Sequence, residues 1–314
     1  DTTLAGVGNG TVIELNVGAT SDNLIENSDT TTGTGVVISD MKLDGRSDLN
    51  TGFPQSGIYL TGIGSGIGGA ATKGANLTGL AIEDFLSNGI RISGSDNNII
   101  SNNFIQNNNT ATAMLFFNSD NNTIAGNRFQ GNYNGIWAID AFNNNTISSN
   151  TFESNGLGIS IAGSSNNTIS SNTITTNEDF GIRFDTGSNN NVVDGNTIDG
   201  GANYGIDTWS SSNNVFSNNN IKNILDTSIF LGSASNNNII NGNRITNSGD
   251  AANNNGIVLD FGSYPDYNQI INNTITDSSC TITCYAISIG NVGSAKNYLE
   301  GNRYTGSAAN AASI

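Results

Sequence analysis

Residues 158–174 carry the pattern that decides the fold: Gly-Ile-Ser-Ile (158–161) leads to Asn-Asn-Thr-Ile-Ser-Ser-Asn-Thr-Ile (166–174). The same order of a short Gly-Ile segment and an Asn-Asn-x-apolar segment returns at 89–105 and at 205–221. From residue 88 onward the recurring order of these two segments divides the chain into nine repeats, most of them 22 to 24 residues long. A fixed period of that length is typical of a solenoid in which each repeat forms one coil.

Three positions of the repeat keep their residue type in all nine copies. The first is an asparagine: Asn98, Asn122, Asn145, Asn167, Asn191, Asn214, Asn238, Asn268 and Asn297. The second, five residues later, is again an asparagine: Asn103, Asn127, Asn150, Asn172, Asn196, Asn219, Asn243, Asn273 and Asn302. The third, two residues after the first, is apolar: Ile100, Ile124, Ile147, Ile169, Val193, Phe216, Ile240, Ile270 and Leu299.

Stacked parallel strands explain these columns. Neighbouring strands lie about 4.8 Å apart, so a residue at one repeat position forms a continuous column along the solenoid. Asparagine amides in such a column can donate to one neighbour and accept from the other. Asparagine also tolerates the left-handed conformation that tight turns require, and we expect it to serve the ladders in both ways. The apolar column predicts a core that no single coil could bury alone. A helical interpretation fails because the alternation has period two and β-branched residues dominate.

We expect residues 1–314 to form a single all-β domain of about 11–12 coils. Coils in 1–87 are predicted to be irregular and loop-bearing, and those in 88–314 regular. Before residue 88, Met41 and Leu80 stand where the second asparagine is expected, so that ladder should begin at Asn103. Longer insertions, which in solenoids project as loops, are predicted near 44–56, 61–75, 247–256 and 277–285.

The composition limits the function classes. The chain of 314 residues has 56 Asn and 39 Gly, no His, and a net charge of −16 with only 10 basic residues. Too few lysines and arginines are present to neutralise nucleic-acid phosphates or to bind an anionic membrane surface. No apolar run reaches the 18 residues of a transmembrane helix. Cys280 and Cys284 are close enough in sequence to close a small disulfide loop in an extracellular compartment, with free thiols as the alternative.

The two ends of the solenoid lack an evident cover. No amphipathic helix precedes Thr11, and the last residues, Ser-Ala-Ala-Asn-Ala-Ala-Ser-Ile (307–314), are a poor cap. Open coils expose unpaired backbone groups and apolar core. We therefore expect either flanking residues that complete the ends, or head-to-tail contacts that build a filament.

The Asn-Asn-Thr-Ile-Ser-x-Asn-Thr-Ile repeats that follow Gly-Ile strands resemble the parallel β-helix repeat of the pectin lyase-like superfamily. Within it they most resemble the Asn-rich, NosD-like surface and periplasmic proteins. The resemblance covers about residues 33–304 and implies a right-handed parallel β-helix that is secreted or displayed on the cell surface. The superfamily includes lyases, hydrolases, epimerases and adhesins, so the fold alone does not fix an activity.

The strands that begin with the repeated isoleucine should present alternate side chains outward. One outward column reads Tyr59, Arg91, Leu115, Trp137, Ser160, Arg183, Asp207, Phe230, Val258 and Ser288. Its neighbour reads Ser93, Phe117, Ile139, Ala162, Asp185, Trp209, Gly232, Asp260 and Gly290. Aromatic rings beside carboxylates suit a groove for a sugar chain. Candidate binding residues are Tyr59, Arg91, Trp137, Trp209, Phe230 and Asp260. The alternative is that the rings cover the sheet or meet a neighbouring subunit, with Arg183–Asp207 as an ion pair between coils.

Three residues are the candidates for catalysis. Asp185 and Asp207 are one coil apart and offset by two residues, which places their attachment points roughly 8 Å apart, within the range of inverting glycosidases. Lyases on the fold that the chain resembles use Arg or Lys as base, often with Ca²⁺ held by acidic residues, and Arg183 beside the two Asp could act so. Calcium is the only cofactor that the resemblance implies.

The segment Tyr204-Gly205-Ile206-Asp207-Thr208-Trp209 is similar to the Tyr-Gly-Phe-Asp-Pro-His signature of alginate C5-epimerases, which would place Tyr204 and Asp207 in that family's catalytic positions. Trp209 stands where the signature has His, and the Pro is missing too. Because the chain has no His, it also lacks the Gly-His-Gly motif of polygalacturonases, which argues against a hydrolase of that kind.

The favoured hypothesis is an extracellular structural or adhesive β-helix whose outward aromatic face binds glycan or a second chain. The rival is a polysaccharide lyase, hydrolase or epimerase working in the same groove.

Overall fold

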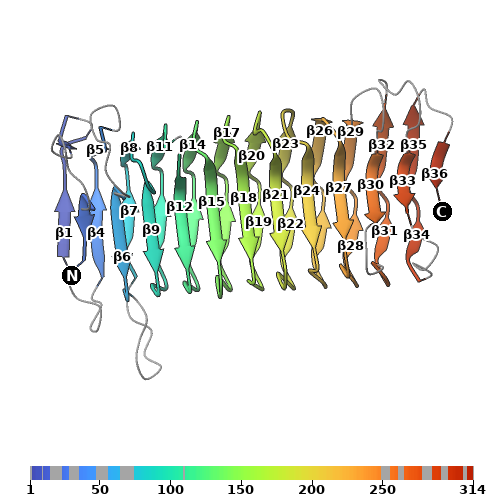
Figure 1. Ribbon diagram of the computed structural model, residues 1–314, viewed down its shortest axis with the longest axis horizontal. Coiled ribbons are helices and arrows are strands. Elements are labelled where there is room, and N and C mark those ends of the chain that lie inside the picture. Colours follow the sequence, from blue (N-terminus) through green and yellow to red (C-terminus); the bar gives the residue numbers. More distant parts are fainter. Residues whose placement is uncertain are drawn as a thin grey trace. The chain divides into compact units, whose positions relative to one another are not determined.

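The computed structural model describes residues 2–8, 10–14, 23–27, 35–46, 56–63, 74–108, 110–248, 255–260, 265–277, 285–290, 296–306 and 310–313. In these ranges the regular structure is all β, with no helix and so none that could cross a membrane. The chain is a parallel β-helix, as the sequence predicts: consecutive strands pass to a first, a second and a third parallel sheet in turn (Figure 1). The chain divides into two compact units, residues 1–156 and residues 157–314.

Unit 1 holds the strands up to β17. Its first sheet contains β1 (Thr2–Ala5), β4 (Val36–Ser39), β7 (Asn76–Thr78), β10 (Ile99–Ser101), β13 (Thr123–Ala125) and β16 (Thr146–Ser148). The second contains β2 (Val12–Glu14), β5 (Lys42–Asp44), β8 (Ala81–Glu83), β11 (Phe104–Gln106), β14 (Arg128–Gln130) and β17 (Thr151–Glu153). The third contains β3 (Ile25–Glu26), β6 (Ile58–Thr61), β9 (Ile90–Ser93), β12 (Thr112–Phe117) and β15 (Asn134–Ile139).

Unit 2 continues the same order from β18. Its first sheet contains β19 (Thr168–Ser170), β22 (Val192–Asp194), β25 (Val215–Ser217), β28 (Ile239–Asn241), β31 (Gln269–Ile271) and β34 (Tyr298–Glu300). The second contains β20 (Thr173–Thr175), β23 (Thr197–Asp199), β26 (Asn220–Ile224), β29 (Arg244–Ser248), β32 (Thr274–Asp277) and β35 (Arg303–Gly306). The third contains β18 (Leu157–Ala162), β21 (Phe180–Asp185), β24 (Tyr204–Trp209), β27 (Thr227–Gly232), β30 (Asn255–Asp260), β33 (Tyr285–Ile289) and β36 (Asn310–Ser313).

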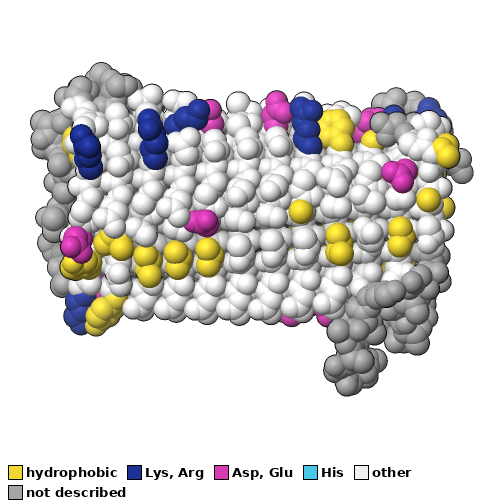
Figure 2. Space-filling model, turned by 180° about the vertical axis from the view of Figure 1, so that it is seen from behind, with side chains coloured by type: hydrophobic (Ala, Val, Ile, Leu, Met, Phe, Trp, Pro, Cys, Tyr) yellow, Lys and Arg dark blue, Asp and Glu magenta, His cyan; other side chains and the backbone are white. Residues whose placement is uncertain are grey.

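The predicted apolar column forms the core. Its members from Ile100 to Ile270 are all 0% exposed, and Leu299 in the last coil is half-buried. The outer surface is different in kind: on the face seen in Figure 2, most side chains are neither hydrophobic nor charged. Burial of one side-chain stripe per strand therefore stabilises coils whose outer faces carry Ser, Thr and Asn.

Both predicted asparagine ladders are present. In unit 1, Asn98 Nδ2 donates to Asn122 Oδ1 at 2.7 Å, and Asn103 Nδ2 donates to Asn127 Oδ1 at 2.9 Å. In unit 2 the second ladder continues with Asn196 Nδ2 donating to Asn219 Oδ1 at 3.0 Å. Each Oδ1 also accepts the backbone N–H of the preceding coil's asparagine. As expected, the second ladder begins at Asn103, whose Oδ1 accepts the N–H of Leu80.

The expectation that ladder asparagines adopt the left-handed conformation is wrong. Positive φ occurs one residue earlier, for example at Asn97 (φ 59°) before Asn98 and at Asn102 (φ 56°) before Asn103. Where that earlier residue is glycine, as at Gly126 before Asn127, φ is positive as well. Two successive residues therefore have different roles in each turn. The first adopts positive φ and reverses the chain, and the second points its side-chain amide inward to hydrogen-bond with the equivalent asparagines of the neighbouring coils.

Two further ladders escaped the sequence analysis. Asn108, Asn132 and Asn155 form a third asparagine column in unit 1, with Nδ2 to Oδ1 distances of 2.9 and 3.0 Å. A buried serine column lies three residues before the first ladder, and in unit 2 the backbone N–H of Ser188 donates to Ser211 Oγ. The third asparagine column lies five residues after the second ladder, and the serine column lies three residues before the first. Both columns follow the period of the repeat, so the sequence alone could have predicted them.

Several expectations concern residues outside the described ranges. Cys280 and Cys284 are among them, so the disulfide stays a prediction. Most residues of the four expected insertions also lie outside the described ranges: 47–55, 64–73, 249–254 and 278–284. The division at 87/88 and the single-domain expectation also stay predictions.

Candidate functional site

Strands β21, β24 and β27 of unit 2 lie side by side and carry the catalytic candidates (Figure 1). Their register aligns Arg183 with Asp207 and Asp207 with Phe230, as the outward column predicts. Arg183 bridges the two carboxylates: its Nη2 lies 3.0 Å from Asp185 Oδ2, and its Nε lies 3.7 Å from Asp207 Oδ2. The three catalytic candidates therefore meet.

Asp207 is the unusual member of this group. It lies in an outward column, yet only 1% of it is exposed. The indole Nε1 of Trp209 donates to its Oδ2 at 3.1 Å. Its Oδ1 is buried without a hydrogen-bond partner among the described residues. Outward orientation in the sheet thus did not mean exposure, because neighbouring side chains cover the carboxyl.

The environment of Asp207 favours its protonated form. Burial raises the pKa of this carboxyl to about 7, and the nearby charge of Asp185 acts in the same direction. The positive charge of Arg183 and the hydrogen bond from Trp209 oppose the rise. Loss of hydration outweighs these two attractions, so the carboxyl changes charge near neutral pH.

Aromatic rings surround this charged group. The Phe180 and Tyr204 rings stack with centroids 5.5 Å apart, and Phe230 packs against both Tyr204 and Trp209 at 5.5 Å. The Arg183 guanidinium lies over the Phe180 ring, 4.8 Å from its centroid. We call these residues the aromatic–acidic surface: Phe180, Arg183, Asp185, Tyr204, Asp207, Trp209 and Phe230.

Phe180 escaped the sequence analysis, because only the two outward columns after the repeated isoleucine were followed. The register pairs it with Tyr204, one position ahead of the Gly-Ile pair. Strict alternation would place Phe180 inward with Ile182, so only its repeat position, and not the alternation, could have found it. Tyr204 itself is half-buried beside Asp226, and its partial burial together with the Asp226 charge and hydrogen bond raises the pKa of Tyr204 to about 12.

A glycine leaves room for the rings. A Cβ built on Gly232 would lie 2.7 Å from Phe230 Cε1 and 3.2 Å from Trp209 Cδ2. The indole can therefore lie over the position next to it on β27, where any side chain would displace it. Asp260, the remaining binding candidate of unit 2, pairs in register with Gly232 and is half-buried.

The other three binding candidates lie in unit 1. Tyr59 pairs in register with Arg91, and the outward column continues through Leu115 to Trp137, of which 39% is exposed. Arg91 lies near the Tyr59 ring, 4.9 Å from its centroid, and near the Phe117 ring at 5.7 Å. Trp137 and Trp209 thus belong to separate groups of residues, one in each unit.

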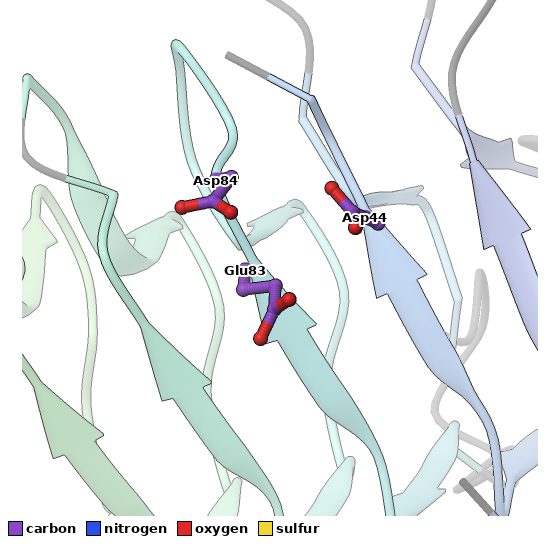
Figure 3. Close-up of side chains that lie close together, drawn as sticks. All are labelled: Asp44, Glu83 and Asp84. Atoms are coloured by element: carbon purple, nitrogen blue, oxygen red, sulfur yellow. The ribbon is translucent and has the colours of Figure 1, made fainter. Parts of the chain in front are cut away.

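Three acidic side chains of unit 1 come close enough to suggest a cation site. Asp44 at the end of β5, Glu83 at the end of β8, and Asp84 are shown in Figure 3. Lys42 already pairs with two of them, at 3.2 Å from Asp44 and 2.5 Å from Glu83. A lysine ammonium therefore supplies the positive charge that a metal ion would bring. Calcium binding stays a prediction.

Residues 24–198 and 141–275 match the model of the family described as the right-handed β-helix region. The chain belongs to this family. Its right-handed parallel β-helix is as the sequence predicts. No curated protein matches the sequence of this β-helix.

Solved structures similar to this β-helix have varied roles. The A-module of a mannuronan C-5 epimerase from Azotobacter vinelandii matches with a TM-score of 0.79 and 16% identity over 96% of this chain and 83% of the module. Gene product 12 of bacteriophage phi29, in its pre-mature form, gives 0.71 and 15% over 98% of this chain and 50% of its own length. A surface adhesin of Streptococcus pneumoniae gives 0.63 and 15% over 97% and 81%. Identities this low establish the fold and leave the activity open.

Proposed function

We propose that this chain is an extracellular or cell-surface saccharide-binding β-helix, and that it binds a sugar chain at the aromatic–acidic surface of unit 2. The observation that carries the proposal is the grouping of the half-buried Phe180, Tyr204 and Trp209 rings around the Arg183–Asp185–Asp207 charges on adjacent strands. Phe230 is only 4% exposed, so this predicted binding residue supports Tyr204 and Trp209 from below and does not contact the sugar. Rings cover the apolar faces of sugars, and charged groups hold their hydroxyls. The fold that the chain shares with a surface adhesin supports an adhesive role.

Binding is favoured over catalysis because of the position of Asp207. A catalytic carboxyl must come within hydrogen-bond reach of the substrate, whereas 1% exposure leaves this one beneath its neighbours. Arg183, Asp185, Tyr204 and Trp209 are half-buried and accessible in part. In this arrangement Asp207 orients the Trp209 indole and the Arg183 guanidinium, and those two contact the ligand.

A second candidate function is polysaccharide processing. The observation in its favour is the pKa of Asp207 near 7, since a general acid or base works best when its pKa is close to the operating pH. Tyr204 and Asp207, which stand in the positions of the alginate C5-epimerase signature, both belong to the aromatic–acidic surface. The mannuronan C-5 epimerase module shares the fold of this chain.

One panel separates the two functions. Uronate-containing and neutral polysaccharides are tested for retention by the protein in affinity electrophoresis, and for turnover by absorbance at 235 nm and by reducing ends. We expect retention of at least one polysaccharide, loss of at least tenfold in affinity in Trp209→Ala, and no product. Tyr298→Ala is the matched control, because it removes a ring that is 53% exposed and lies on the first sheet, outside the aromatic–acidic surface. Product formation that disappears in Asp207→Asn would establish the enzyme instead, and no retention of any polysaccharide would refute the binding proposal.

Head-to-tail self-association stays a separate prediction. Sedimentation of the purified chain over a range of concentrations tests it, and a constant monomer mass would contradict it.

A further inference from the structure

In the part of the chain that the structure describes, aromatic rings rather than a counter-charge hold Arg91 of unit 1 in place. Its guanidinium lies between the Tyr59 and Phe117 rings, 4.9 and 5.7 Å from their centroids. Such cation–aromatic contacts on two sides fix the side chain before any ligand arrives. An arginine ordered in this way loses less freedom on binding than a mobile surface arginine does.

The hydrogen-bond donors of Arg91 are not fully used. Among the described residues, no carboxylate pairs with it, and its Nε is buried without an acceptor. Other cations of unit 1 behave differently: Arg46 pairs with Glu14 and Arg128 with Glu153. In a chain with 26 acidic and 10 basic residues, an unpaired and half-buried arginine is notable. A buried donor without an acceptor costs free energy, and an incoming ligand could supply the missing acceptor.

An aromatic surface lies beside this donor. Leu115 separates Arg91 from Trp137 in the register of the third sheet, so the two attachment points are about 9.6 Å apart at 4.8 Å per strand. Trp137 is 39% exposed, whereas the Tyr59 and Phe117 rings are half-buried. A sugar stacked on the indole can therefore extend toward the guanidinium.

From this geometry we propose that Arg91 binds a carboxylate of an acidic saccharide whose ring stacks on Trp137. The planar fork of N–H donors in a guanidinium matches the two oxygens of a carboxylate. The proposal rests on the proposed function and adds to it a second surface, in the other unit, together with a ligand class: uronate-containing sugar chains.

Trp137 provides the readout. In the Trp209→Phe background it is the only tryptophan of the chain, so its fluorescence reports binding at this surface and at no other. The probes are oligouronides, each compared with its carboxyl-reduced counterpart, which keeps the sugar and lacks the charge. A sulfated neutral oligosaccharide is the third arm, because it shares the negative charge and differs in geometry.

We expect oligouronides to bind at least tenfold more tightly than their carboxyl-reduced counterparts. Arg91→Met should abolish that preference, and Arg91→Lys should lose most of it, because an ammonium lacks the planar fork. Arg244→Met is the matched control, since it removes the same charge from an exposed position on the second sheet of unit 2. Circular dichroism confirms that each variant is folded.

Equal affinity for charged and reduced saccharides would overturn the proposal, and so would a preference that survives in Arg91→Met. Tighter binding of the sulfated ligand would overturn the carboxylate assignment. Binding of oligouronides with no change in Trp137 fluorescence would overturn the proposal as well. The proposed function is judged separately, at Trp209, so the failure of one can be told from the failure of the other.

Discussion

At the scale of single residues, Asp207 concentrates the unusual chemistry of this chain. Its place in the sequence predicts an outward carboxylate aligned with Arg183, and the structure aligns the two residues as predicted. Its burial was not predictable from sequence, because it depends on how the Trp209 indole folds back to donate to Oδ2. Periodicity fixes which side chains share a column, whereas the conformations of long side chains decide which of them water can reach.

Asp207 should also leave a signature in the pH dependence of stability. Its pKa in the unfolded chain is near 3.8 and in the folded protein about 7, so the folded state holds a proton that the unfolded state releases. This contribution to stability is complete below about pH 3.8 and is lost as the pH rises to about 7, with a magnitude of about 4 kcal/mol.

The test is urea denaturation between pH 4 and 8. The unfolding free energy of Asp207→Asn should fall less between pH 4 and 7 than that of the wild type, because an amide does not titrate. Asp185→Asn is the matched control on the same sheet, since its carboxylate is more exposed. Parallel pH profiles for the wild type and Asp207→Asn would contradict the burial of this carboxyl.

At the scale of elements, the repeat predicted almost everything about the coils. Asn98 and Asn103 head ladders where expected, and the apolar column is buried. The conformation of the turns was assigned to the wrong residue: Asn97 and Asn102 take the positive φ. Both members of an Asn-Asn pair look alike in sequence, and only the backbone shows which one bends and which one points inward.

A ladder asparagine should be costly to remove. In Asn196→Ala, the backbone N–H and the Nδ2 of Asn172 lose their acceptor, and the Ile169 carbonyl loses its donor. Buried groups left without partners cost roughly 1–3 kcal/mol each, so we expect a loss of at least about 3 kcal/mol in unfolding free energy. The neighbouring turn residue Asn190, with φ 58°, offers the control, because Asn190→Gly suits that conformation and should change stability little. Thermal melts of the two variants that coincide would contradict the structural role of the ladders.

At the scale of the whole molecule, fold and function separate clearly. The fold followed from columns of identical residues, and the match to the right-handed β-helix family agrees with it. Structures of the same fold include a polysaccharide epimerase module and a surface adhesin, so architecture does not choose between them. The choice rests on the outward positions of the third sheet, because their residue type varies from coil to coil and includes Trp, Arg and Asp.

The two tryptophans make the central claim directly testable, because one lies in each unit. In Trp137→Phe, the only remaining indole is Trp209, which is bonded to Asp207 within the aromatic–acidic surface. Titration of this variant with the polysaccharide that the wild type retains should change Trp209 fluorescence saturably. Retention of the polysaccharide with no change in Trp209 fluorescence would contradict saccharide binding at the aromatic–acidic surface.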